Sequence, residues 1–411
     1  MRIMNNANGI ERRILVVNAG SSSLKFSVYQ VDAGLVRLIA GKIDRIGQHG
    51  RVSITWSEGN GPASTEPFLS EKSFDETIDQ FFDWLGQRFN LVACAAVGHR
   101  VVHGGPRFDR PTRVDAELLS ELGRLAPFDP EHLPFQIGLM NAIDRRAPGV
   151  AQVACFDTAF HRDLPDVARR FAIPRRYYDH GIRRFGFHGL SFAYLMEELA
   201  RLSGGSAPPR VVLAHLGNGA SLAAVLDGRC IDTTMGLSPA GGIPMSTRSG
   251  DLDPGLIQYL WATEGMTPDS LRELTNRQSG LLGISGVSGD MRELLDREPT
   301  DPHCREAVDL FCNAVRKQVG AYAATLGGLD AVVFSGGVGE NSSAIRARIC
   351  KNLDFLGIIL DDASNSSSAG VISKAGTRVT TRVIPTDEET MIARETIEIL
   401  REATPNIPMK P

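Results

Sequence analysis

The sequence contains few cysteines, and none of them forms a close pair. Its six cysteines among 411 residues are scattered, with no C-x-x-C motif, so we predict buried thiols rather than a disulfide framework or a cysteine zinc site. No apolar run approaches the length of a membrane span, and the N-terminal residues lack the apolar core of a secretory signal. We therefore expect a cytoplasmic protein that does not bind membranes.

Several common nucleotide-binding signatures are also missing. The chain has no G-x-G-x-x-G fingerprint, no G-x-x-x-x-G-K-[ST] loop and no H-R-D set of the protein kinases. A formal net charge of only -4 gives no reason to expect a nucleic-acid partner. If this protein binds ATP, it does so on another scaffold. Glycine, by contrast, is abundant, and many of the 42 glycines cluster between predicted strands.

The order of the predicted elements indicates an α/β chain whose pattern occurs twice. In each half a short meander of strands is followed by alternating helices and strands. The first half is predicted to contain strands at 14–17, 24–30, 36–40, 91–97 and 150–156 and helices at 75–89, 116–125 and 134–146. The second is predicted to contain strands at 211–215, 222–226, 230–233, 331–335 and 379–384 and helices at 254–264, 302–326 and 388–400. The serine-rich stretch 364–370 is predicted to be a low-complexity surface loop.

A strand–turn–strand motif stands near the start of each half. The first is N-A-G-S-S-S-L-K at 18–25 and the second is H-L-G-N-G-A-S at 215–221. Small residues at such turns let backbone amides approach phosphate oxygens. Lys25 alternates onto the strand face opposite Leu24 and Phe26, where its charge could meet a phosphate. A simple hairpin with a polar turn is the alternative.

Charged residues at predicted strand ends are the next candidates. Arg100, in H-R-V-V-H-G-G, has a planar fork that suits a bidentate anion, although a structural ion pair is the alternative. Arg248, in T-R-S-G-D-L-D-P, is a second anion-clamp candidate. Asp157 ends an apolar strand in F-D-T-A-F-H. It is either a helix N-cap or a carboxylate at the sheet edge where ligands bind.

Three further motifs carry candidates. His188, flanked by glycines in G-F-H-G, either donates to a transferring phosphoryl group or is structural. The run F-S-G-G-V-G-E-N-S at 334–342 follows a strand and opens a helix, so a ligand could lie on its backbone. The run Thr386-Asp387-Glu388-Glu389 follows the last predicted strand, and taken alone it favours a cap of the last helix over a Mg²⁺ anchor.

Together these motifs resemble the acetate kinase family, within the wider acetate and propionate kinase group, from about Arg12 to Arg401. The resemblance implies the fold shared with sugar kinases, heat-shock chaperones and actin. That fold is α/β, with two duplicated actin-like ATPase (ribonuclease H-like) domains and an active-site cleft between them. The implied N-terminal domain spans 12–157 and 391–411. The implied C-terminal domain spans 158–390 and would carry the nucleotide site and the interface of a homodimer.

The activity implied by the resemblance is the reversible transfer of the γ-phosphoryl group from ATP to acetate. The products would be acetyl phosphate and ADP, and Mg²⁺ would be required, with Mn²⁺ as a substitute. Propionate or butyrate is the alternative acceptor, and an ATP-driven binding protein of the heat-shock or actin kind is an alternative of another class. Because a carboxylate is already nucleophilic, the enzyme must chiefly align the substrates and neutralise like charges.

The resemblance also assigns residues. The catalytic residues would be Asp157, His188 and Arg248, and Asn18 and Glu388 would hold the metal. Arg100 would bind the acyl carboxylate, beside an apolar pocket of Val102, Phe128, Phe187 and Pro239. The ATP contacts would be Lys25, His215, Leu216, Gly217, Asn218, Gly219, Asp290, Met291, Arg292, Gly337, Val338, Gly339, Glu340 and Asn341.

The sequence departs from the family pattern at three places. Phe128 replaces the usual pocket leucine, and Asp129-Pro130-Glu131-His132 follows it where family members have H-N-P or H-Q-P. Phe192 replaces the second histidine of G-F-H-G-T-S-H. These changes bear on the acyl-chain preference and leave the phosphoryl-transfer residues in place.

Overall fold

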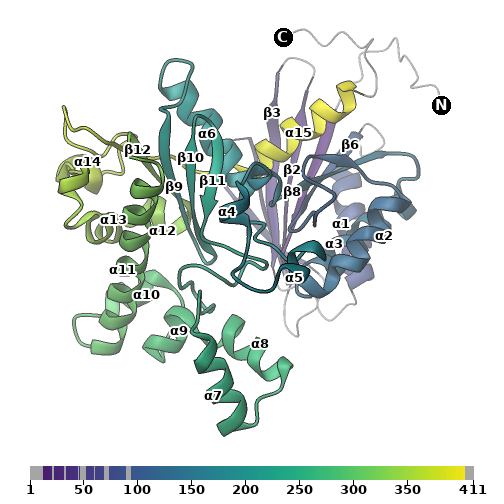
Figure 1. Cartoon of the computed structure of the whole chain (residues 1–411). Helices are drawn as coiled ribbons and strands as arrows, with labels where there is room; N and C mark the ends of the chain where they lie inside the picture. The colour runs from purple at the N-terminus through teal and green to yellow at the C-terminus, as the bar shows by residue number, and fades with distance from the viewer. Residues whose placement is uncertain are drawn as a thin grey trace. The chain divides into compact units, whose positions relative to one another are not determined.

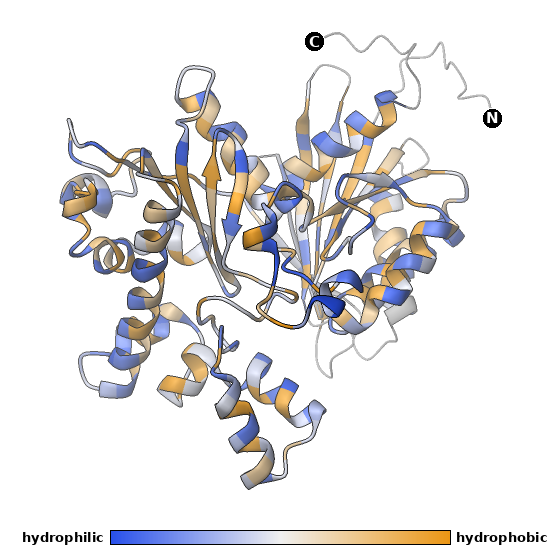
Figure 2. Ribbon diagram, in the orientation of Figure 1, coloured by the Kyte–Doolittle hydropathy of each residue, from blue (hydrophilic) through white to orange (hydrophobic). Residues whose placement is uncertain are grey.

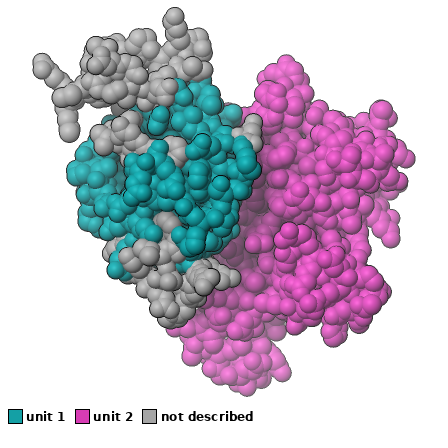
Figure 3. Space-filling view, turned by 180° about the vertical axis from the view of Figure 1, so that it is seen from behind, with its two compact units in different colours: residues 1–159, 387–411 teal, residues 160–386 magenta. Residues whose placement is uncertain are grey.

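The computed structural model describes residues 13–20, 23–31, 34–44, 46, 52–59, 61–68, 74–88 and 94–402. Ser21 and Ser22 of the first motif, and 91–93 of a predicted strand, lie outside these residues. The chain divides into two compact units, coloured separately in Figure 3. Unit 1 comprises residues 1–159 and 387–411, and unit 2 comprises residues 160–386. This division assigns residues 387–390 to unit 1, whereas the boundary expected from sequence lies after residue 390.

Unit 1 is built on one mixed sheet of eight strands in the order β5-β4-β3-β2-β1-β6-β8-β7. The meander is antiparallel throughout. It consists of β1 (Arg13–Ala19), β2 (Ser23–Gln30), β3 (Val36–Asp44), β4 (Val52–Glu58) and β5 (Ser64–Phe68). On its other side β1 is parallel to β6 (Cys94–Val101), which is parallel to β8 (Ala151–Phe156). The short β7 (Thr112–Arg113) closes that edge in the antiparallel sense.

Helices cover both faces of this sheet. On one face α1 (Phe74–Arg88) and α3 (Leu133–Arg146) pack in a core that includes Phe26 and Val97, and α2 (Ala116–Leu125) packs on α3. The last helix, α15 (Glu388–Glu402), packs against β1, β6 and β8 (yellow in Figure 1). A side chain at Gly98 would meet Ile392 of α15. Because neighbouring residues of a strand face opposite sides, α15 covers the face opposite α1 and α3.

Unit 2 repeats the same strand order on a smaller sheet. Its order, β11-β10-β9-β12-β13, matches β3-β2-β1-β6-β8 of unit 1, with the first three strands antiparallel and the last three parallel. The strands are β9 (Arg210–Leu216), β10 (Ala220–Leu226), β11 (Arg229–Thr233), β12 (Ala331–Ser335) and β13 (Thr380–Val383). Apolar residues, orange in Figure 2, run along the strands of both sheets. The predicted α/β fold with a duplicated pattern is therefore confirmed.

The helices of unit 2 vary widely in length. The longest are α6 (Gly189–Leu202) and α11 (Pro302–Thr325). The others are α4 (Asp166–Arg169), α5 (Arg175–Asp179), α7 (Pro254–Glu264), α8 (Pro268–Arg277), α9 (Gly280–Ser285), α10 (Met291–Arg297), α12 (Gly336–Asn341), α13 (Ser343–Cys350) and α14 (Asp362–Ser366). Among the described residues, no helix is both long and apolar enough to cross a membrane. All six cysteines are free thiols, and all but Cys94 are buried.

One local prediction is wrong in part. The stretch 364–370 lies largely at the surface as predicted, but its first residues belong to α14 and Asn365 is only 5% exposed. Its serine-rich composition resembles that of a solvated loop, but Asn365 and Ser368 instead accept hydrogen bonds from a buried arginine. The sequence analysis also did not predict β4, β5 or α6.

The contact of α15 with β6 can be tested at Gly98. A Cβ atom there would lie 2.3 Å from Oγ1 of Thr396 and 2.7 Å from Cγ2 of Ile392. We expect Gly98→Ala to lower the free energy of unfolding by about 1–3 kcal/mol, because the helix must shift to admit the methyl group. Urea denaturation measures this difference. Gly86→Ala in α1 is the control, since a Cβ there has no neighbour within 4 Å. Equal loss of stability in both variants would contradict the proposed packing.

Candidate active site

Polar side chains of unit 1 gather where three parallel strands end. Asn18 lies near the end of β1, Arg100 near the end of β6, and Asp157 directly after β8. Because these strands are parallel neighbours, their carboxyl ends share one edge of the sheet. Glu388 starts α15, which packs on the same strands. We call Asn18, Arg100, Asp157, Glu388 and Glu389 the strand-end set.

The centre of the strand-end set is an ion pair between Arg100 and Asp157. Nε of Arg100 donates to both carboxylate oxygens at 3.1–3.2 Å, and Nη2 donates to Oδ2 at 2.6 Å. Asp157 is only 1% exposed. Burial by itself lowers the pKa of Arg100, but the charges of Asp157 and Glu388 outweigh this effect and raise it above its ordinary value. Burial raises the pKa of Asp157 and Arg100 opposes the rise. Arg100 therefore remains charged and bound to this carboxyl group.

Asn18 connects this ion pair to the start of α15. Its Oδ1 accepts from Nη1 of Arg100 at 3.2 Å, and its Nδ2 donates to Glu388 at 3.1 Å and to Glu389 at 3.2 Å. The cap predicted for the run 386–389 is formed by Asp387, whose carboxylate accepts from the Thr390 amide at 3.0 Å. Glu389 belongs to the same run, and the sequence assigned it no further role.

The oxygen donors of this set fit a magnesium ion. Mg²⁺ prefers carboxylate and amide oxygens and is held by one or two carboxylates together with substrate phosphates. Glu388 and Glu389 are donors of this kind, and the amide oxygen of Asn18, which here accepts from Arg100, joins them when the amide is turned over. Among the described residues, no three His, Cys, Asp or Glu side chains form a ready-made metal cluster. The set therefore fits a metal that arrives with a phosphate ligand better than a permanently bound one.

The other predicted residues of unit 1 lie around this edge. Lys25 is opposite Asn18 in the β1–β2 register and is exposed, while Leu24 and Phe26 are buried, as the alternation predicts. Val102 is buried, and the Phe128 ring lies 5.7 Å from that of His103.

Sequence reasoning missed Gln136, a buried residue of α3. Its amide donates to the Ala19 carbonyl and accepts from the Val102 amide, both at 3.1 Å, so one side chain ties the ends of β1 and β6 together. The only signal in the sequence was a polar residue on the inner side of a predicted helix.

In unit 2 two histidine rings are stacked. The centroids of His188 and His215 are 4.5 Å apart, with 29° between the ring planes. Nδ1 of His188 lies 2.9 Å from Oγ of Ser221, and Nδ1 of His215 lies 2.8 Å from Oγ of Ser191. Each ring is therefore oriented by a serine hydroxyl that sequence reasoning did not single out, although both serines belong to the quoted motifs.

The stacked rings adjoin Arg248. A Cβ atom on Gly219 would lie 3.1 Å from Nε2 of His188 and 3.6 Å from Nη1 of Arg248, so both cationic candidates face this glycine. Nη1 of Arg248 also donates to the Pro239 carbonyl at 3.1 Å. We call His188, His215, Gly219 and Arg248 the histidine set. Phe187 is buried next to His188, and Phe192, the departure from the family pattern, is buried in the core of the unit.

The segments predicted to contact ATP lie close together in unit 2. A Cβ on Gly336 would lie 2.7 Å from the Leu216 carbonyl oxygen, and one on Gly217 would lie 3.9 Å from the Gly337 amide. Ser246 donates through its amide to Asn218 at 3.1 Å and through its hydroxyl to the carbonyl of Gly289, the neighbour of Asp290, at 2.8 Å. The turn after β9, the start of α12 and the start of α10 therefore adjoin one another.

Not every residue of these segments has its side chain available to a ligand. Oε1 of Glu340 accepts from the amides of Gly336 and Thr386 at 2.8 and 3.1 Å, so this carboxylate clamps the backbone. Asp290 caps α10 and pairs with Arg292, and Met291 is buried. Their assignment to ATP remains a prediction.

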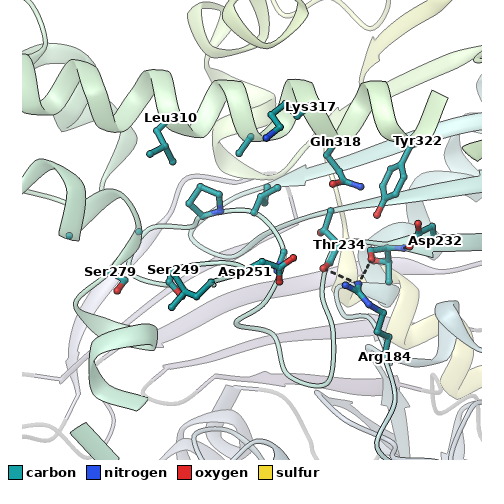
Figure 4. Close-up of a pocket in the computed structure, with 18 of the residues that line it drawn as sticks. Arg184, Asp232, Thr234, Ser249, Asp251, Ser279, Leu310, Lys317, Gln318 and Tyr322 are labelled. Atoms are coloured by element: carbon teal, nitrogen blue, oxygen red, sulfur yellow. Dashed lines mark hydrogen bonds between the residues drawn. The ribbon is translucent and has the colours of Figure 1, made fainter. Parts of the chain in front are cut away.

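A cavity of about 920 Å³ in unit 2 is a different feature. It is lined mainly by β11, α11 and the loops around 242–252 and 278–284. Figure 4 shows Arg184 reaching from below toward Thr234, and its Nη1 donates to the Thr233 carbonyl at 3.1 Å. None of the predicted site residues lines this cavity.

Comparison with known proteins agrees with the motifs. The model of the Acetokinase family matches residues 13–394, nearly the whole chain. The chain belongs to this family. An acetate kinase of Nitrobacter hamburgensis is 44% identical over 94% of this chain and 96% of its own length. A propionate kinase of Citrobacter rodentium is 41% identical over 96% and 99% of the two chains.

Solved structures of family members share the fold. A propionate kinase from Francisella tularensis aligns with a TM-score of 0.88 at 35% identity, covering 93% of this chain and 98% of that one. An acetate kinase from Porphyromonas gingivalis aligns with a TM-score of 0.84 at 35% identity, covering 95% and 100%. Membership of the acetokinase family implies the use of ATP.

Gly219 tests the geometry of the histidine set. We expect Gly219→Ala to lower kcat/KM for the phosphoryl-transfer reaction by about tenfold or more, because the methyl group would push the His188 ring away from its place beside Arg248. The melting temperature should hardly change, since Gly219 is only half-buried and the ring edge needs to shift only slightly. A coupled assay of ADP formation measures the rate. Gly320→Ala in α11, where a Cβ has no neighbour within 4 Å, is the control. Unchanged kinetics in Gly219→Ala would contradict this role for the glycine.

Proposed function

We propose that this protein is an acetate kinase. It transfers the γ-phosphoryl group of ATP to a carboxylate oxygen of acetate in one in-line step and releases acetyl phosphate and ADP. The same residues catalyse the reverse reaction. The observation that carries the proposal is a paired arginine at the ends of the central strands of a chain that belongs to the acetokinase family.

Arg100 has one edge suited to the acceptor acid. Asp157 binds the edge made by Nε and Nη2, and Asn18 accepts from Nη1. A guanidinium carries five N–H groups. One hydrogen on Nη1 and one on Nη2 point away from Nε, and this pair suits both oxygens of a substrate carboxylate. Asp157 fixes the plane of that fork.

The histidine set provides charge for the transferred group. Arg248 and His188 both face Gly219, and Ser221 orients the ring of His188. Donors fixed in this way stabilise the charge on the equatorial oxygens in the transition state without reorganising. In this proposal the turn at 215–219 and the segment 337–341 contact ATP.

We assign the binding of the metal to residues of the strand-end set. Asn18, Glu388 and Glu389 would hold Mg²⁺, for which Mn²⁺ can substitute. When bound, the ion neutralises charge on the nucleotide phosphates. Without metal, the two glutamates would repel the phosphates, so chelation should abolish turnover.

Acetate is the favoured acceptor, and propionate is the alternative. Relatives with both names have similar identity to this chain, since acetate kinases range from 40% to 44% and a propionate kinase has 41%. Val102 and Phe128 would face the acyl group, and the phenyl ring favours a short chain. Comparing kcat/KM for acetate, propionate, butyrate and valerate tests this choice. A higher value for propionate would overturn it.

The decisive experiment traps the product with hydroxylamine. Purified protein is incubated with ATP and Mg²⁺, with and without acetate. We expect hydroxamate to form, and ADP to be released, only when acetate is present. Hydrolysis of ATP that is independent of acetate and yields no hydroxamate would instead favour an ATP-driven binding protein.

Arg248→Ala tests the transition-state role. We expect kcat to fall by about 10²–10³, because one charged donor to the transferring group is lost. Folding should be preserved, since Arg248 is not fully buried and donates to the neutral Pro239 carbonyl. Arg201→Ala, at an exposed ion pair on α6, is the matched control. Equal rates in the two variants would rule out the role.

We also propose that the protein forms a homodimer through unit 2. No residue of α7 is buried in the single chain, and Tyr259 and Trp261 are 62% and 70% exposed. Large apolar side chains gathered on one helix are typical of an interface. The protein should have twice the chain mass by light scattering, and Trp261→Asp should shift it to one chain. A single-chain wild-type protein would refute the dimer.

A further inference from the structure

Arg346 of α13 is a fully buried arginine whose hydrogen-bond acceptors are all uncharged. Its exposure is 0%. Nε donates to Oδ1 of Asn365 at 2.8 Å, and Nη2 donates to the Asn365 carbonyl at 2.6 Å and to Oγ of Ser368 at 3.0 Å. Nη1 donates to the carbonyls of Gly339 and Glu340, both at 2.9 Å. All five N–H groups of the guanidinium are therefore used. Burying such a charge is costly in free energy, which indicates that these hydrogen bonds have a structural role.

The two carbonyls bound by Nη1 belong to α12. This helix has only six residues, three of them glycine, and so short a helix has little stability of its own. At its start it abuts Leu216 and Gly217 of the turn after β9. Its end is held by Arg346. The segment 337–341 thus has its backbone fixed at both ends, by the β9 turn and by one buried side chain.

The other partners of Arg346 form a second support. Asn365 is buried and donates through Nδ2 to the Ser343 carbonyl at 3.0 Å. Ser368 has a φ of 50°, in the left-handed region that L residues seldom adopt. Its hydroxyl donates to the Glu340 carbonyl at 3.2 Å as well as accepting from Arg346. The serine-rich stretch after α14 is therefore tied to α12 directly and through Arg346.

We infer that Arg346 is a positioning residue for nucleotide binding. Braced by Asn365 and Ser368, it fixes the carbonyls of Gly339 and Glu340 and thereby the backbone of 337–341, the segment proposed to contact ATP. This inference rests on the proposed function. Lysine could not replace it, because an ammonium group has three donors and no planar fork to span four acceptor residues.

The experiment compares Michaelis constants for the two substrates. We expect Arg346→Met to raise KM for ATP by about tenfold or more, while KM for acetate stays nearly the same, because none of the residues bonded to Arg346 belongs to the strand-end set. Arg346→Lys should be intermediate. Asn365→Ala and Ser368→Ala should each raise KM for ATP by a smaller factor. Ser367→Ala is the matched control, since its hydroxyl bonds only to carbonyls of its own helix.

A second readout separates this inference from the proposed function. Calorimetric titration of ATP in the absence of acetate should show weaker binding to Arg346→Met than to the wild type. A rise in both KM values together, or a loss of thermal stability with KM for ATP unchanged, would overturn the inference. If Arg346→Met does not fold, Asn365→Ala and Ser368→Ala decide by the same criterion. A wild-type protein that binds ATP but forms no acetyl hydroxamate would refute the proposed function instead.

Discussion

The ion pair between Arg100 and Asp157 is the interaction on which the rest of unit 1 depends. A charge placed at the end of a buried strand must be matched, and removal of either partner leaves the other uncompensated. The parallel order of β1, β6 and β8 brings the two residues together, and Asn18 extends the network to α15. The network that stabilises the fold is therefore the same one that fixes the plane of the Arg100 guanidinium.

In unit 2 neutral groups, rather than carboxylates, hold the candidate site residues in position. The two stacked histidines are oriented by serine hydroxyls, and a glycine leaves room for His188 and Arg248 to approach. The buried Arg346 is satisfied by amide, carbonyl and hydroxyl oxygens rather than by a carboxylate. These neutral acceptors fix the position of each side chain without forming an ion pair with it.

How far the sequence predicts the site depends on where each residue lies. Asn18, Arg100 and Asp157 could be found because polar residues at the ends of apolar runs are visible in a linear pattern. Ser221 and Gln136 could not be given roles in this way, since each acts on a ring or backbone group far along the chain. Arg346 and Asn365 were missed because only their tertiary contact explains why both are buried. The cap predicted for the run 386–389 could be found, because Asp387 bonds to an amide three residues away.

The return of the chain in α15 has a consequence for biosynthesis. Unit 2 is synthesised before α15. During that interval unit 1 lacks the helix that covers one face of β1, β6 and β8. During that interval Asn18 has neither acidic partner. A polypeptide that ended before α15 would therefore contain most of the fold yet lack both acidic residues beside Asn18.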